Sequence, residues 1–240
     1  MQDNTPWLFI HVMKTAGTSF RAYVEEIAPS QVFPSKSDRE RTGGNYMGAL
    51  QFLTSLSSGT IKPDSTPYMF GHFPAWMSDK VDPSWRVATV LREPVARTVS
   101  MLGHHNARLG AKYSDLRDLL LDDNFRKNNL ENYQTKVFGA EPDHITSAND
   151  QHICTEETYE AALERIGRFD MVGLTEEISQ TVDRWHEVTD LPRGEFPHFN
   201  KAKPREIDTE LRDAILPYVQ LDLRFYDTVK STIAVNHLST

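Results

Sequence analysis

The chain has 240 residues, of which 39% are hydrophobic and 25% charged, and its 26 basic and 34 acidic residues give a formal net charge of −8. This length is enough for one sizeable core, and no Gly/Ser-rich or Pro-rich linker interrupts it, so we expect one domain over residues 1–240. The negative charge argues against generic nucleic-acid binding, because affinity for a phosphate backbone comes mainly from clustered Lys and Arg. No apolar run approaches membrane-spanning length, so we expect no membrane span.

The N-terminal segment and the cysteine content indicate a compartment. MQDNTPW lacks the basic and apolar regions of a secretory signal. Cys154 is the only cysteine and has no partner for an intrachain disulfide. Both features favour a reducing environment, and we therefore expect a soluble cytoplasmic protein.

The first strong pattern is WLFIHVMKTAGTSFR, from Trp7 to Arg21. Its apolar start is typical of a buried parallel strand, and apolar residues from Phe20 to Ile27 recur at helical spacing. Lys14 ends the strand segment, and small or hydroxylated residues join it to the helix: Thr15, Ala16, Gly17, Thr18 and Ser19. Backbone N–H groups at a helix N-terminus bind anions, and ligands of open α/β sheets bind at the carboxyl ends of strands. The pattern therefore predicts a phosphate site, with hydroxyl donors from Thr18 and Ser19.

The order of residues in this loop selects the kind of phosphate ligand. The lysine precedes the glycine, so the motif G-x-x-x-x-G-K-[ST] of ATP-binding proteins is absent. HVMKTAGTSF instead resembles the 5′-phosphosulfate loop of the carbohydrate sulfotransferases related to heparan sulfate 2-O-sulfotransferase. Those enzymes use PAPS, 3′-phosphoadenosine 5′-phosphosulfate, and this chain looks like a soluble, bacterial-type member. The family usually has proline where Met13 stands, a change that we expect to preserve activity because proline there would only stiffen the approach to the loop. The alternative is an ordinary strand-to-helix turn with a surface lysine.

Two segments follow before the next strand. Ser30 to Asn45 is polar, charged and Gly-rich, which predicts a long loop near the mouth of the site that could act as a lid. Tyr46 to Ser57 predicts a helix that packs on the sheet through an apolar face made of Met47, Leu50, Leu53 and Leu56.

His72 is the candidate general base. It follows Gly71 at the end of a short apolar strand within Pro67 to Met77. A histidine in such a place is often a hydrogen-bonded structural residue, and that alternative stays open on the residues alone. In the sulfotransferases that this chain resembles, the catalytic histidine directly follows a glycine after the second strand. The resemblance implies that His72 takes the proton of the acceptor hydroxyl.

A second motif, REPVARTVSML, follows the strand Trp85 to Leu91. Pro94 suits a first helical turn, and Arg92 stands at the carboxyl end of the strand. LREPVARTVS resembles the family segment in which an arginine and a serine hold the 3′-phosphate of the donor, which implies this role for Arg92 and Ser100. For Arg97 we prefer a solvated helix arginine or an ion pair with Glu93.

The remaining segments are predicted as scaffold with one exception. The pattern predicts helical segments at Asp115 to Phe138, Glu156 to Ile166 and Ile207 to Val229, a loop at Ala140 to Gln151, a strand at Phe169 to Leu174, and a helix through His186 capped by Thr175. The segment NYQTKVFG resembles an Asn-x-x-Thr segment of the family, which we interpret as supporting the site. Asp190 to Pro204 holds three prolines after Asp190 and cannot sustain a helix. The resemblance implies that Asn200, Lys201 and Lys203 in this loop contact the phosphates of the donor, and solvated lysines are the alternative.

Alternating strands and helices predict an α/β fold, a P-loop-like open parallel sheet with helices on both faces. The resemblance implies transfer of a sulfuryl group from PAPS to a hydroxyl of a glycan, glycolipid or small metabolite, with Lys14 stabilising the leaving group and no metal. His104 and His105 are adjacent on a helix and point apart, so we expect no metal site there. The alternatives are a P-loop phosphotransferase that uses ATP and a non-catalytic nucleotide-binding protein.

Overall fold

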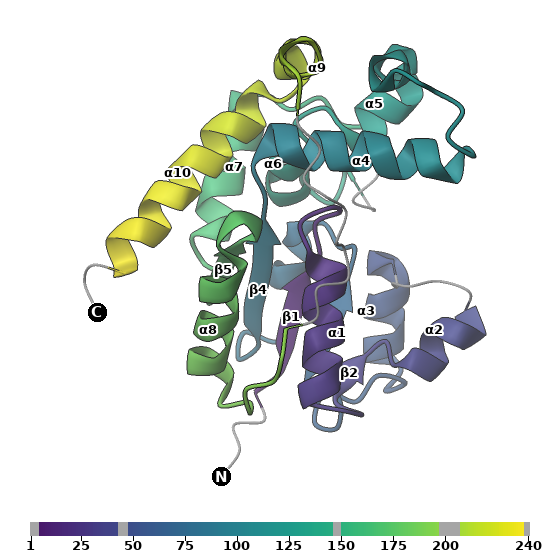
Figure 1. Cartoon of the computed structure of the whole chain (residues 1–240). Helices are drawn as coiled ribbons and strands as arrows, with labels where there is room; N and C mark the ends of the chain where they lie inside the picture. Colours follow the sequence, from purple (N-terminus) through teal and green to yellow (C-terminus); the bar gives the residue numbers. More distant parts are fainter. Residues whose placement is uncertain (1–4, 43–47, 146–149, 197–206, 238–240) are drawn as a thin grey trace.

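A computed structural model of the chain describes residues 5–42, 48–145, 150–196 and 207–237. Its centre is a sheet of five parallel strands in the order β2-β3-β1-β4-β5 (Figure 1). The strands are β1 (Trp7–Ile10), β2 (Val32–Phe33), β3 (Tyr68–Gly71), β4 (Arg86–Leu91) and β5 (Met171–Leu174). The predicted open parallel sheet is confirmed.

The order of the strands decides which side chains can meet. Strand β1 lies between β3 and β4, with Ile10 opposite Gly71 on one side and Thr89 on the other. Parallel strands end at the same edge of a sheet, so the residues that follow β1, β3 and β4 emerge next to one another. This edge brings together the segments that carry Lys14, His72 and Arg92.

Ten α-helices lie within the described part of the chain. They are α1 (Gly17–Ile27), α2 (Lys36–Thr42), α3 (Ala49–Ser57), α4 (Pro94–Arg108), α5 (Asp123–Asn129), α6 (Tyr133–Gly139), α7 (Glu156–Ile166), α8 (Ile178–Thr189), α9 (Thr209–Ile215) and α10 (Gln220–His237). Short 3₁₀ helices cover Ala75–Asp79, Leu116–Leu121, Thr175–Glu177 and Leu216–Tyr218. Among the described residues, no helix is both long and apolar enough to cross a membrane.

Helices α1 and α8 cover one face of the sheet (Figure 1). Phe9 of β1 stacks on Phe20 of α1, and Phe20 meets Trp185 of α8 edge to face with ring centroids 5.3 Å apart. All three side chains are buried, and aromatic side chains of this size contribute a large share of core stability. Helix α1 is thereby fixed against β1, and its N-terminus is held at the carboxyl edge of the sheet.

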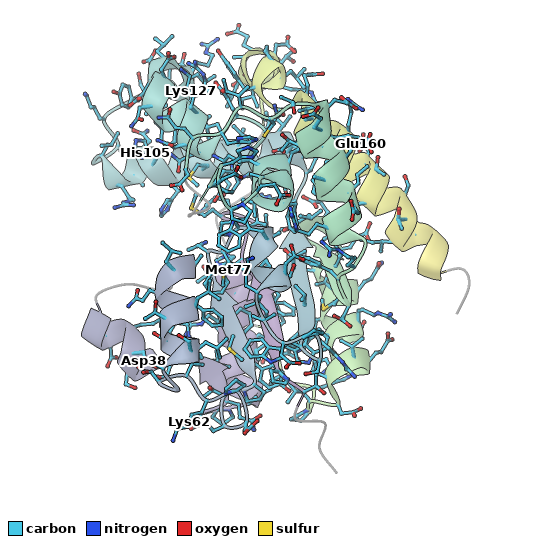
Figure 2. The ribbon with its side chains drawn as sticks, turned by 180° about the vertical axis from the view of Figure 1, so that it is seen from behind. Asp38, Lys62, Met77, His105, Lys127 and Glu160 are labelled. Atoms are coloured by element: carbon cyan, nitrogen blue, oxygen red, sulfur yellow. The ribbon has the colours of Figure 1, made fainter. Side chains whose placement is uncertain are left out.

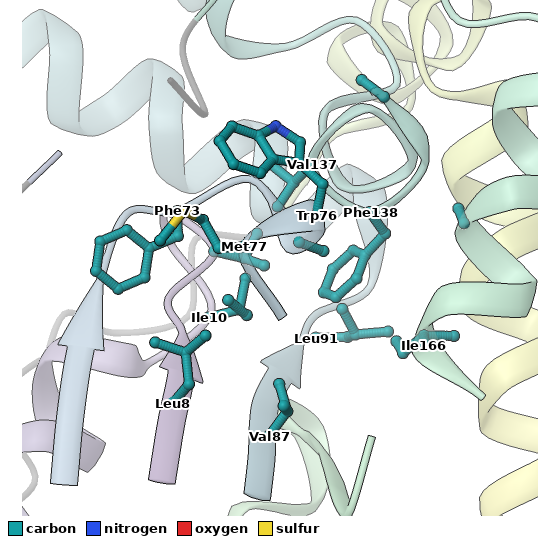
Figure 3. Packing of buried hydrophobic residues seen from close by; sticks show 14 of the residues in the cluster. Leu8, Ile10, Phe73, Trp76, Met77, Val87, Leu91, Val137, Phe138 and Ile166 are labelled. Carbon is teal, nitrogen blue, oxygen red and sulfur yellow. The ribbon is translucent and has the colours of Figure 1, made fainter. Parts of the chain in front are cut away.

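Residues of α3, α6, α7, α10 and the turn after β3 cover the opposite face. Figure 3 shows Leu8 and Ile10 of β1 in this cluster, with Phe138 of α6 nearby. The alternation of Leu8 and Ile10 with Phe9 sends neighbouring side chains of one strand to opposite faces. The all-apolar sequence of β1 therefore follows from its burial on both sides.

A third apolar cluster lies above the carboxyl edge of the sheet and joins α4, α5 and α9. Leu102 of α4 is fully buried in it together with Ile215 of α9. Figure 1 shows α4 running across the top of the molecule above the ends of the strands. From behind, His105 and Lys127 lie in this upper layer, whereas Asp38 and Lys62 lie on the lower part of the molecule (Figure 2). The upper layer places the second half of the REPVARTVSML motif beside the sheet edge.

Two sequence predictions before β3 need correction. Ser30 to Asn45 is not one long loop, because Val32–Phe33 pairs with β3 as an edge strand and Lys36–Thr42 forms α2. In α3 the fully buried side chain is Phe52, whereas Leu50 is 60% exposed. Leu53 and Leu56 pack on the core as predicted, so the prediction is wrong for Leu50 and missed Phe52; Met47 lies outside the described residues.

Two predictions in the second half also need correction. The segment from Asp115 to Phe138 is not one continuous helical stretch, because Asp115 and Asp122 each accept a backbone N–H and begin a new short helix. Thr175 does not cap α8 but donates its hydroxyl to the Leu91 carbonyl at the end of β4, at 3.0 Å. The helix at Glu156–Ile166 has its predicted boundaries, and the predicted strand narrows to Met171–Leu174.

Candidate active site

The loop between β1 and α1 has a backbone shape suited to an anion. Lys14 and Ala16 adopt left-handed conformations with φ of 70° and 64°, and the first intrahelical bond runs from Phe20 N to Ala16 O at 3.0 Å. The N–H groups of the first turn of an α-helix point beyond its N-terminus, where an anion can accept them. Thr15 is buried and donates its hydroxyl to the Val12 carbonyl at 2.9 Å, which braces the loop.

Two arginines set the direction of the peptide groups in this loop. Arg97 Nε donates to the Met13 carbonyl at 3.1 Å, and Arg92 Nη1 donates to the Lys14 carbonyl at 3.2 Å. In a trans peptide the C=O of one residue and the N–H of the next point in opposite directions. The N–H groups of Lys14 and Thr15 therefore point away from the arginines.

The same arginines place two positive charges beside Lys14, and Glu176 and Glu93 lie close enough to Arg92 to raise its pKa against the effect of burial. Burial lowers the pKa of Lys14 first, and the charges of Arg92 and Arg97 lower it further. Arg92 is partly buried, and its Nε is buried without a hydrogen-bond partner in the described part of the chain. An unpaired buried N–H of a charged group is costly, and an anionic ligand with several acceptor oxygens would satisfy it.

Arg97 does not have the solvated position or the ion pair that the sequence favoured. It is fully buried, its guanidinium lies 3.8 Å from the ring centroid of Tyr133, and Nη1 donates to the Asn129 carbonyl. Burial lowers the pKa of Arg97 to about 10, so the group stays charged at neutral pH. Glu93 instead caps α4, accepting from Val95 N at 3.2 Å and Ala96 N at 2.7 Å. Helical spacing predicted the shared face of Glu93 and Arg97, but it could not show that the face is buried.

His72 is held in a state suited to accept a proton. Its Nδ1 lies 3.0 Å from the main-chain carbonyl of His11, and a carbonyl oxygen only accepts, so Nδ1 carries the hydrogen. In the neutral ring this leaves a lone pair on Nε2. Burial lowers the pKa of His72 below its usual range, and the bond to His11 offsets part of that shift. The ring is therefore neutral at physiological pH.

His11 connects His72 to the loop between β1 and α1, a role that no pattern in the sequence predicted. The two imidazoles stack with centroids 4.5 Å apart, and His11 is 3% exposed. The His11 ring also lies against Gly17, where an added Cβ would come within 1.9 Å of its Cδ2. Gly17 is thus required for close packing on His11, and it couples the start of α1 to the position of His72.

Ser100 lies on the side of α4 that faces the loop. Arg97, Ser100 and His104 are spaced three and four residues apart and share one helix face. Arg97 contacts the loop at Met13. Burial is the main cause that lowers the pKa of His104, and the charge of Lys14 is the next, so His104 also lies near the loop. Ser100 is partly buried between these two positions. Arg92 and the Ser100 face therefore approach the same loop.

The other predicted contacts divide into two groups. Thr18 is exposed and Ser19 is buried in the first turn of α1, beside Ala16 and Gly17. Asn200, Lys201 and Lys203 lie outside the described residues. Within the described ranges, no group of three or more His, Cys, Asp or Glu side chains is arranged to hold a metal ion.

Comparison with known proteins adds a likeness of fold. No protein-family model and no curated protein sequence matches the chain. A solved structure described as a sulfotransferase from Alicyclobacillus acidocaldarius superposes with a TM-score of 0.54 at 15% sequence identity, covering 94% of this chain and 95% of that chain. Sequence identity this low carries the architecture alone, and the chain therefore has the fold of a bacterial sulfotransferase structure.

Proposed function

We propose that this protein transfers a sulfuryl group from PAPS to a hydroxyl of an acceptor molecule. The observation that carries the proposal is the meeting of three strand ends, where Lys14 follows β1, His72 follows β3 and Arg92 follows β4. A cationic loop, a neutral imidazole and a partly buried guanidinium are the groups that the reaction requires, and the likeness to a sulfotransferase fold supports the same function.

The donor would lie along the carboxyl edge of the sheet. The backbone N–H groups from Thr15 to Ser19 lie at the start of α1 and, with the ammonium of Lys14, suit the 5′-phosphosulfate. The carbonyl contacts of the two arginines direct the N–H groups of Lys14 and Thr15 away from those arginines. Arg92 suits the 3′-phosphate, because its buried Nε needs an acceptor and a guanidinium can bind two phosphate oxygens together. Ser100 supplies a hydroxyl on the facing helix, and Asn200, Lys201 and Lys203 are proposed to add contacts.

The reaction needs one base and one stabilised leaving group. His72 Nε2 takes the proton of the acceptor hydroxyl as its oxygen forms a bond to sulfur, while the bond from sulfur to the bridging 5′-phosphate oxygen breaks. The products are a sulfate ester, 3′,5′-ADP and a protonated imidazole that returns its proton to solvent. Lys14 and the loop N–H groups stabilise the charge that grows on the leaving phosphate; one such donor is typically worth about 2.7 to 4 kcal/mol.

Radiolabelled PAPS tests the proposal. Wild-type protein is incubated with labelled PAPS and a panel of neutral glycans, glycolipids, hydroxylated metabolites and polyanionic glycans, and labelled products are counted. We expect transfer to at least one acceptor, and its loss in Lys14→Ala. Lys62→Ala is the matched control, since Lys62 is exposed on the lower part of the molecule (Figure 2). Transfer by Lys14→Ala at the wild-type rate would contradict the mechanism.

A further inference from the structure

The side chain of Gln134 hydrogen-bonds both main-chain groups of Arg92, its N–H and its carbonyl. The Arg92 N–H donates to Gln134 Oε1 at 3.1 Å, and Gln134 Nε2 donates to the Arg92 carbonyl at 2.8 Å. Gln134 is fully buried at the start of α6, so neither bond competes with water. Arg92 follows the last residue of β4, where the strand ladder no longer satisfies its main-chain groups. The side-chain amide continues the ladder for one residue.

The main chain of Gln134 is held by two helix caps, one from α10 to α6 and one from α6 to α10. Asp222 of α10 accepts from Gln134 N at 3.1 Å, Thr135 N at 2.7 Å and Thr135 Oγ1 at 2.8 Å, and so caps α6. Asn132, just before α6, returns the interaction by accepting from Leu221 N at 2.9 Å and Asp222 N at 3.3 Å in α10. Asp222 is 1% exposed. Each helix thus begins on a side chain of the other, which leaves Gln134 little freedom to move.

The carbonyl of the same peptide group is held as well, so the main chain from which the Arg92 side chain extends is fixed by contacts that no ligand makes. Thr175 donates to the Leu91 carbonyl at 3.0 Å, one residue before Arg92. Beyond this fixed main chain, Arg92 Nη1 reaches the Lys14 carbonyl and its Nε lacks a partner among the described residues. A bidentate contact with a phosphate depends on the direction of the guanidinium plane. Fixing the main chain of Arg92 on both sides supplies that direction.

We infer that Gln134 is a positioning residue that aims Arg92 at the 3′-phosphate of the donor. The inference rests on the proposed function, and it adds a discriminating residue that never touches the ligand. Gln134 acts through Arg92, so its removal should weaken recognition of the 3′-phosphate specifically. Contacts with the 5′-phosphate come from the loop, which Arg97 also holds through the Met13 carbonyl, so they should weaken much less than contacts with the 3′-phosphate.

The test is a double-mutant cycle on one ratio, the dissociation constant of 5′-AMP divided by that of 3′,5′-ADP, measured by titration calorimetry. The variants are Gln134→Met, Arg92→Ala and the double variant. Thr181→Val is the matched control, because Thr181 is also buried and also bonds both main-chain groups of a strand-end residue, Leu174 of β5. It removes a comparable pair of bonds without touching Arg92.

We expect Gln134→Met to lower the ratio about tenfold and Thr181→Val to leave it unchanged. In the Arg92→Ala background, Gln134→Met should cause no further loss, because a residue that acts through Arg92 has nothing left to position. An unchanged ratio in Gln134→Met, or an equal loss with and without Arg92, would overturn the inference.

Two further measurements keep the outcomes distinct. A wild-type ratio of one would contradict the proposed function. Hydrogen exchange at the Arg92 N–H then still tests whether Gln134 holds the main chain of Arg92. Faster exchange in Gln134→Met than in Thr181→Val supports that role, and equal exchange refutes it. If Gln134→Met does not fold, Gln134→Glu replaces it, because a protonated carboxyl can donate and accept as the amide does. In Gln134→Glu the ratio of the two dissociation constants should rise towards the wild-type value as the pH falls. A ratio that stays below the wild-type value by the same factor at every pH would contradict the inference.

Discussion

His72 combines a defined tautomer with a neutral charge, the two properties that a general base needs. We expect His72→Ala to lower the rate of sulfuryl transfer by about 10² to 10⁴, because the acceptor hydroxyl loses its proton acceptor. The affinity for 3′,5′-ADP, measured by calorimetry, should stay near the wild-type value since Nε2 faces the acceptor in this mechanism. Wild-type turnover in His72→Ala would remove the residue from the mechanism, and a parallel loss of nucleotide affinity would make it a binding residue.

The pKa of His72 also sets a pH dependence of stability. Burial places the folded-state pKa of His72 below the unfolded value of about 6.5, and burial does the same more strongly for His11. Between these values the unfolded chain binds more protons than the folded chain, so the free energy of unfolding rises with pH there and is lost as the pH falls. Urea unfolding should therefore show lower stability at pH 5.5 than at pH 7.5, with a smaller difference in His72→Ala. A difference as large as that of the wild type would show that His72 does not contribute.

At the residue scale, the sequence predicted the groups that stand next to a strand end and not the contacts that hold them. Lys14, His72 and Arg92 each follow an apolar run, and parallel strands place such residues at one edge. His11, Gln134 and Asp222 depend on contacts with residues 61, 42 and 88 positions away, which no local pattern encodes. The sequence had assigned the segment NYQTKVFG, which contains Gln134, to the support of the site, but the particular contacts of these three residues became visible only in the folded chain.

At the scale of elements, the start of α1 is tightly packed against the residue that follows β1. An added Cβ at Gly17 would come within 1.9 Å of the His11 ring, on which His72 stacks. We expect Gly17→Ala to destabilise the protein by about 1 to 3 kcal/mol and to slow sulfuryl transfer, because the displaced ring disturbs His72. Thermal unfolding and the transfer assay measure the two effects.

The neighbouring position provides the control for Gly17→Ala. Ala16 has a φ of 64°, a conformation that glycine adopts without steric cost. Ala16→Gly should consequently fold with little or no loss of stability, although it changes the same turn. If Gly17→Ala is tolerated as well as Ala16→Gly, the packing of His11 against Gly17 does not control the loop.

The elements themselves were predictable where they are long or strongly apolar. The strands at Tyr68–Gly71 and Arg86–Leu91 and the helix at Glu156–Ile166 follow directly from their patterns. The two-residue strand Val32–Phe33 was missed because its pairing with β3 comes from tertiary contact and its flanks are polar. The helical region predicted from Asp115 to Phe138 is divided into short helices, because leucine periodicity hid the capping aspartates at Asp115 and Asp122.

At the scale of the whole molecule, charge constrains the acceptor. The chain carries 34 acidic against 26 basic residues, and several arginines are already engaged in the fold: Arg97 is buried, Arg39 pairs with Glu25, and Arg224 pairs with Glu156. A net negative surface disfavours the approach of a polyanion. We therefore predict a neutral or cationic acceptor.

The expectation of one domain over residues 1–240 and that of a cytoplasmic location both stay predictions.

Acceptor charge is tested by competition in the transfer assay. Unsulfated neutral oligosaccharides and alcohols compete with heparan and chondroitin chains for label from PAPS at low and physiological salt. Label should enter neutral acceptors with weak dependence on salt, because no long-range attraction is being screened. Strongly salt-sensitive transfer to the polyanions alone would contradict this prediction.

Calorimetric titration of the full chain with 3′,5′-ADP, 5′-AMP and ATP with Mg²⁺ tests the central claim most directly, because it needs no knowledge of the acceptor. A charge-assisted contact is commonly worth about 1.5 to 3 kcal/mol, so the 3′-phosphate should tighten binding by about tenfold or more over 5′-AMP, and Arg92→Ala should abolish that preference. ATP with Mg²⁺ should bind more weakly than 3′,5′-ADP. Tighter binding of ATP with Mg²⁺, or equal affinities for 3′,5′-ADP and 5′-AMP in the wild-type protein, would contradict the assignment of this site to PAPS.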